Sequence, residues 1–96
     1  MGKKLPPKQL ELYQGIDEIL WKDWDPADVS DSPDSRDEYY PYLPVVFNMA
    51  LNGADSLEIA QYLSSVTQEN MGLSANTNLD KVVAEKITQL KTQIGI

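Results

Sequence analysis

The chain has 96 residues, a hydrophobic fraction of 42%, and 15 acidic against 8 basic residues, which gives a formal net charge of −7. This hydrophobic fraction is ordinary for a globular protein, so we expect one small folded domain over residues 1–96. Cysteine and histidine are both absent, which excludes disulfides, thiolate catalysis, cysteine-based zinc or iron–sulfur sites, histidine-dependent triads and zinc hydrolase sites.

The charge balance also bears on partners and location. Nucleic acid and anionic lipid carry phosphate, so both should be repelled by an acidic chain whose basic residues are scattered. Residues 1–7 lack the apolar run of a signal peptide, and we expect them to form a flexible N-terminal segment. No window approaches the roughly 20 apolar residues that a membrane span needs. The sequence therefore predicts a cytoplasmic protein that binds neither nucleic acid nor membrane.

Apolar residues recur at i, i+3 and i+4 in four stretches, and none shows the alternation of a strand. The first stretch contains Gly15, which costs about 1 kcal/mol relative to alanine inside a helix and would let another helix approach closely. These patterns predict an all-α protein, a compact four-helix domain with a long acidic loop between helices 1 and 2. The expected helices cover about Lys8–Lys22, Val45–Gly53, Ser56–Gly72 and Leu79–Ile94.

Capping residues mark the expected helix ends. Asp37 is a candidate N-cap for the second helix, with prolines near its first turn. Ser56 is expected to cap the third helix, and Thr77 or Asn78 the fourth. Gly72 should end the third helix in the left-handed conformation that glycine adopts without strain.

The most unusual segment runs from Trp21 to Tyr42, where acidic residues recur among two tryptophans and three tyrosines. An exposed ring keeps apolar area in water at about 25 cal/mol per Å², so we expect Trp21 and Trp24 to form a lid on the small core. Tyrosine is common at interface hot spots, and acidic neighbours speed the approach of a basic partner. The residues predicted to contact a partner protein are Asp34, Asp37, Glu38, Tyr39, Tyr40 and Tyr42.

Two other functions compete with protein binding. Hard cations such as Ca²⁺ prefer oxygen ligands, and the loop is rich in carboxylates. The EF-hand spacing fails, because Ala27 would stand at the fifth position and Asp28 at the required glycine, so only weak divalent-cation binding stays open. A pair such as Asp23 and Asp25 could serve a small carboxylate-based enzyme, but no second reactive group accompanies it. We therefore expect no catalytic, metal-ligating or cofactor-binding residues, and no cofactor.

Several short motifs also lie at a characteristic spacing. They are W-D-P at Trp24–Pro26, D-E-Y-x-x-Y at Asp37–Tyr42, a helical segment beginning at Gly53, and M-G-L at Met71–Leu73. Together they resemble a family of short, uncharacterised bacterial proteins, over about Ile16–Leu90. The chain departs from that family at Ala27-Asp28, usually Ile-Gly, and at Tyr40, usually an acid. The resemblance implies a small helical cytosolic domain of bacterial type.

The segment D-E-Y-Y-P-Y, residues 37–42, is also similar to the Tyr-Tyr-Pro element of the nuclease-colicin immunity proteins. Those proteins are acidic four-helix domains that mask a basic toxin. The resemblance implies that Asp37, Glu38, Tyr39, Tyr40 and Tyr42 would form the toxin-facing patch. The sequence thus predicts a small, non-enzymatic protein-binding domain, immunity- or antitoxin-like, whose acidic-aromatic loop engages a basic partner protein.

Overall fold

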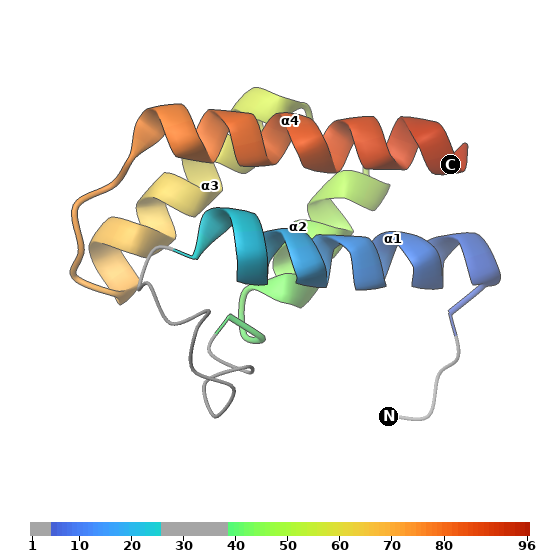
Figure 1. Ribbon diagram of the computed structural model, residues 1–96, viewed down its shortest axis with the longest axis horizontal. Helices are drawn as coiled ribbons and strands as arrows, with labels where there is room; N and C mark the ends of the chain where they lie inside the picture. The colour runs from blue at the N-terminus through green and yellow to red at the C-terminus, as the bar shows by residue number, and fades with distance from the viewer. Residues whose placement is uncertain (1–4, 26–38) are drawn as a thin grey trace.

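The computed structural model describes residues 5–25 and 39–96, and within them the predicted all-α, four-helix fold is confirmed, with no strand present (Figure 1). Two of the four helices continue directly into π-helical segments. The elements in chain order are α1 (Pro7–Glu18), η1 (Ile19–Trp24), α2 (Leu43–Leu51), α3 (Ser56–Ser65), η3 (Val66–Asn70) and α4 (Thr77–Ile94).

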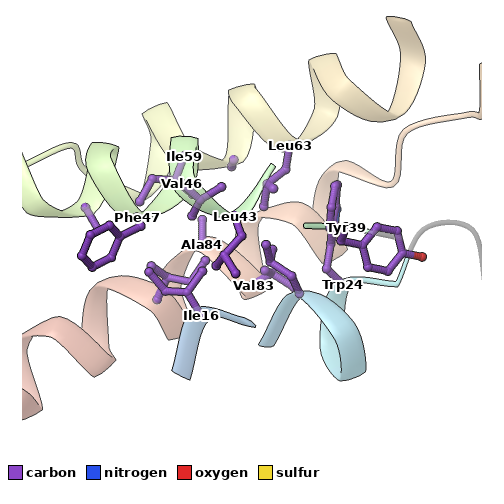
Figure 2. Close-up of a cluster of buried hydrophobic side chains, with 14 of the residues drawn as sticks. Ile16, Trp24, Tyr39, Leu43, Val46, Phe47, Ile59, Leu63, Val83 and Ala84 are labelled. Atoms are coloured by element: carbon purple, nitrogen blue, oxygen red, sulfur yellow. The ribbon is translucent and has the colours of Figure 1, made fainter. Parts of the chain in front are cut away.

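The helices surround a single apolar core. Figure 1 shows α1–η1 and α4 running in opposite directions as two long rods, with α2 and α3 packed against them. Each helix contributes fully buried aliphatic side chains, and Figure 2 shows several of them meeting at the centre. The innermost of these residues are Leu12, Ile16, Val46, Ile59, Leu63, Val83 and Ile87.

At Gly15, α1 lies close to a side chain of α4. A methyl group at this position would overlap Cδ2 of Leu90, which lies on α4. Glycine at this position lowers helix propensity, but it leaves the space that the Leu90 side chain occupies. The prediction that Gly15 allows another helix to come close is confirmed.

The third helix is capped one residue before the predicted position. Asp55, not Ser56, is the N-cap of α3: the Glu58 N–H donates to Asp55 Oδ1 at 2.9 Å, and the Asp55 N–H donates to Glu58 Oε1 at 3.3 Å. This reciprocal capping box needs a glutamate or glutamine three residues after the cap. Counting from Ser56 puts Ile59 in that place, which has no acceptor.

The fourth helix begins at Thr77, two residues earlier than predicted. Asn76 caps α4, because its side-chain oxygen accepts the Leu79 N–H at 3.1 Å, so Thr77 and Asn78 are already inside the helix. Asparagine is a better N-cap than threonine. Gly72 adopts a left-handed conformation, φ +67°, just after η3, as predicted.

The second helix follows a tight turn over Tyr39–Tyr42. The N–H of Tyr42 donates to the carbonyl of Tyr39 at 3.0 Å, and α2 then begins at Leu43 with Pro44 in its first turn, as expected. No side chain caps α2, and its predicted cap, Asp37, lies outside the described residues.

The π-helical segments were not predicted. In each one a backbone N–H reaches five residues back: Asp25 to Leu20 at 3.1 Å, and Met71 to Val66 at 3.1 Å. Such single π turns are rare and occur often at functional sites. Here η1 leads into the acidic segment, and η3 leads into the connector before α4.

Candidate functional site

An aromatic cluster lies around residues 25 and 39, which flank positions 26–38 in the sequence. Its members are Trp21, Trp24, Tyr39 and Tyr42. The ring centroids of Trp24 and Tyr39 are 5.3 Å apart, and Tyr42 meets Trp24 edge-on at 6.2 Å. Trp24 is 1% exposed and Trp21 is also buried, so the prediction that both tryptophans close the core is confirmed. Figure 2 shows Trp24 and Tyr39 together at one end of the core.

A hydrogen bond joins Asp25 and Tyr39, the described residues on either side of positions 26–38. Asp25 has a left-handed backbone, φ 35°, and ends η1. Its carboxylate Oδ1 accepts the Tyr39 hydroxyl at 2.6 Å, across fourteen positions of sequence. A short charge-assisted bond of this kind is stronger than one between neutral groups. Residues 25 and 39 are therefore held beside each other on the aromatic cluster.

A buried carboxylate connects this cluster to α3 and α4. Asp80 on α4 is 1% exposed; its Oδ1 accepts the Trp24 Nε1–H at 2.9 Å, and its Oδ2 accepts the Ser64 hydroxyl at 2.6 Å. Both oxygens are thus satisfied, as a buried carboxylate requires. Asp80 ties η1, α3 and α4 together and was not identified from the sequence.

A signal for Asp80 was nevertheless present in the sequence. Asp80, Val83, Ala84 and Ile87 follow the i, i+3, i+4, i+7 spacing of a core-facing stripe, and all four are buried. An acid on such a stripe must find hydrogen-bond donors. Its position could have predicted a buried polar contact, although the donors could not be named.

The three tyrosines predicted to face a partner lie in different environments. Tyr40 is 46% exposed and Tyr42 is half-buried, whereas Tyr39 is 3% exposed. Tyr39 is buried because its ring packs against Trp24 and its hydroxyl donates to Asp25. The other predicted contact residues, Asp34, Asp37 and Glu38, lie outside the described residues.

The acidic residues that border the segment have separate partners. Asp23 forms an ion pair with Lys86 on α4 at 3.4 Å, while Asp25 accepts from Tyr39. Within residues 5–25 and 39–96, no three acidic side chains come together as a metal site. The carboxylates considered as calcium ligands at positions 26–38 are not among these residues.

Two open grooves lie away from the aromatic cluster. One, of about 460 Å³, is bordered by α2 and α3 and includes Val45 and Asn48. The other, of about 480 Å³, lies between α3–η3 and the first turns of α4. Neither groove is lined by a residue predicted to bind a partner.

Comparisons with protein-family models, curated proteins and solved structures found no match to this chain. Among the helices described, none is long and apolar enough to cross a membrane.

Proposed function

We propose that this chain is a small, acidic, non-enzymatic protein-binding domain that engages a basic partner protein, in the manner of an immunity protein or antitoxin. Its contact surface, the acidic-aromatic surface, consists of Asp34, Asp37, Glu38, Tyr40 and Tyr42. The observation that carries the proposal is the exposed ring of Tyr40, 46% accessible, next to a buried and hydrogen-bonded Tyr39.

The fixed backbone of Tyr40 favours a role of its exposed ring in binding. A tyrosine has few rotatable bonds, and a fixed backbone reduces what must still be ordered when a partner arrives. Here the backbone of Tyr40 lies in a hydrogen-bonded turn between Tyr39 and α2. An exposed ring on such a base can act as an anchor at the centre of an interface.

The charge of the adjoining segment favours a basic partner. Residues 26–38 contain four aspartates and one glutamate, against the single basic residue Arg36. Like-signed charges close together create a field that speeds encounter with a partner of opposite sign. A basic protein is therefore the partner class with the best complementarity to this surface.

We take the setting of this function to be the bacterial cytoplasm, as the motif resemblance implies. The structure brings residues of two of the motifs into contact. The W-D-P and D-E-Y motifs are separated in the sequence, yet Trp24 and Asp25 contact Tyr39 directly. Residues from both motifs thus meet in the aromatic cluster. In this proposal the motif residues hold the segment, and Tyr40 with the neighbouring acids contacts the partner.

Capture from a lysate tests this proposal. Wild-type protein serves as bait beside Tyr40→Ala and the triple variant Asp34→Lys/Asp37→Lys/Glu38→Lys. We expect a basic protein that wild type retains and that both variants lose or retain poorly.

A matched variant separates local from overall charge. Glu11, Glu18 and Glu85 are exposed and lie on α1 and α4. Changing these three to lysine raises the net charge by six, from −7 to −1, as the loop triple variant does. This control should capture the partner nearly as well as wild type. Equal loss in the control and loop variants would contradict a specific role for the acidic-aromatic surface.

A further inference from the structure

The groove between α2 and α3 is formed largely by an outer stripe of α2. Figure 2 shows Val46 and Phe47, on the inner side of this helix, within the core. A second stripe, at i, i+3, i+4 and i+7, lines the groove of about 460 Å³. Its members are Val45, Asn48, Met49 and Asn52. The turn after α2 and the first turn of α3 complete the lining with Gly53, Ala54 and Glu58.

The apolar surface of this groove comes from Val45, Met49 and Ala54. Val45 is 41% exposed, and Met49 and Ala54 are half-buried. A methionine side chain adapts to the shape of an apolar neighbour, because it is unbranched and has several rotatable bonds. Burying this surface against a ligand would remove apolar area from water. The occupant should therefore have an apolar part.

The charge of the groove is negative. Among the described residues that line it, Glu58 is the one charged side chain. Glu58 is exposed, and its Oε1 accepts the Asp55 N–H at 3.3 Å in the capping box, which positions the carboxylate. A carboxylate offers about four acceptor sites, so others remain for a ligand. The oxygens of the Asn48 and Asn52 amides can also accept. A cation with several donors is the polar group that fits best.

The surrounding part of the chain has the same sign of charge. Residues 37–80 include α2 and α3 and contain six acidic residues and no lysine or arginine. The lysines of the described chain lie on α1, η1 and α4, and none of them lines this groove. Since charges of one sign on one part of the surface attract a ligand of the opposite sign, the groove favours a cationic occupant.

An arginine side chain meets both requirements. Its aliphatic stem can cover apolar surface, and its planar guanidinium group carries five donors and a permanent charge. We propose that this groove binds an arginine side chain of the basic partner protein, with the stem on Val45 and Met49 and the guanidinium bonded to Glu58. The proposal rests on the proposed function only in assigning the arginine to that partner.

The groove lies within reach of the proposed contact surface. Tyr40 precedes Val45 by five positions, in the turn that leads into α2. Five residues span at most about 18 Å, so one interface of ordinary size can include both positions. The arginine would thus add a second contact beside the ring of Tyr40.

Titration with a small arginine derivative tests the groove without a partner. The probe is N-acetyl-arginine N-methylamide, added to the full ¹⁵N-labelled chain and followed by amide chemical shifts. We expect saturable shifts at Asn48, Gly53 and Glu58, and none at Ser65 or Asn78 in the other groove. The matched neutral probe is N-acetyl-citrulline N-methylamide, which has the same length without the charge. It should bind roughly two- to fivefold more weakly at low salt, and added salt should narrow this difference.

Two matched variants test the carboxylate. Glu58→Gln removes the charge and keeps the capping box, because glutamine also serves at the third helical position. This variant should bind the arginine probe roughly two- to fivefold more weakly, as expected for one exposed ion pair. Glu85→Gln, at an exposed position on α4, changes the net charge equally, from −7 to −6, and should bind the probe like wild type.

Three results would overturn the proposal: no shifts in the groove, equal affinity for the two probes, or equal losses in Glu58→Gln and Glu85→Gln. Because the titration uses no partner, its result is independent of the capture experiment. Failed capture beside successful arginine binding would contradict the proposed function alone, whereas failed arginine binding would contradict the groove alone.

Discussion

Trp24 contributes to stability in two separable ways, through its buried ring and through its bond to Asp80. Removing a buried tryptophan side chain costs about 3–5 kcal/mol. Leaving a buried oxygen of Asp80 without its donor costs about 1–3 kcal/mol more. We therefore expect Trp24→Ala to lower the free energy of unfolding by about 4 kcal/mol or more, a large share of the roughly 5–14 kcal/mol typical for a domain of this size. Trp24→Phe keeps most ring contacts and should cost about 1–3 kcal/mol.

Urea unfolding followed by far-ultraviolet circular dichroism measures both losses, because the helical signal does not depend on tryptophan emission. Gln89→Ala, at an exposed position on α4, is the control and should stay within about 0.5 kcal/mol of wild type. If Trp24→Phe were as stable as wild type, the bond to Asp80 would contribute nothing. A loss below about 2 kcal/mol for Trp24→Ala would show that the ring is not part of the core.

Other substitutions test the helix contacts, a cap and a titrating group. Gly15→Val should destabilise by about 1–3 kcal/mol in thermal unfolding, since its side chain would overlap Leu90; an unchanged Tm would contradict this close approach. Asp55→Ala should cost about 1 kcal/mol in urea, whereas Asp55→Asn should keep the cap. Burial, and then the nearby Tyr42, raise the pKa of Tyr62 above 10.0. The folded state therefore favours the neutral phenol, so the contribution of Tyr62 to stability is present in full below pH 10.0 and is lost as pH rises through the raised pKa. Tyr62→Phe should lose less stability over that rise, which urea unfolding below and above pH 10.0 would measure.

The helices could be predicted because each buries one stripe of apolar residues at helical spacing. The π-helical turns could not, because over five or six residues their spacing differs too little from that of an α-helix to change the apolar pattern. The caps of α3 and α4 were placed one or two residues late. For α3 the decisive feature was Glu58, whose side chain selects Asp55 as its partner.

The candidate site could be predicted only in part. Burial of the tryptophans could be predicted from their large apolar rings. Tyr39 and Tyr40 could not be distinguished in this way, because they are adjacent residues of the same type. Which of them is buried depends on the turn over residues 39–42, whose direction is set by contacts with η1. The donors to Asp80 come from 56 and 16 positions away, so only the packing of η1 and α3 against α4 identifies them.

The most direct test of the proposed function is the rate of association with the captured partner as a function of salt. The Debye length falls from about 30 Å at 0.01 M to about 3 Å at 1 M salt, so a steered encounter slows steeply over this range. We predict that wild type and the Glu11/Glu18/Glu85 control associate fast at low salt. The Asp34/Asp37/Glu38 reversal should associate slowly at every salt concentration. Equal low-salt rates for wild type and the loop reversal would contradict the account.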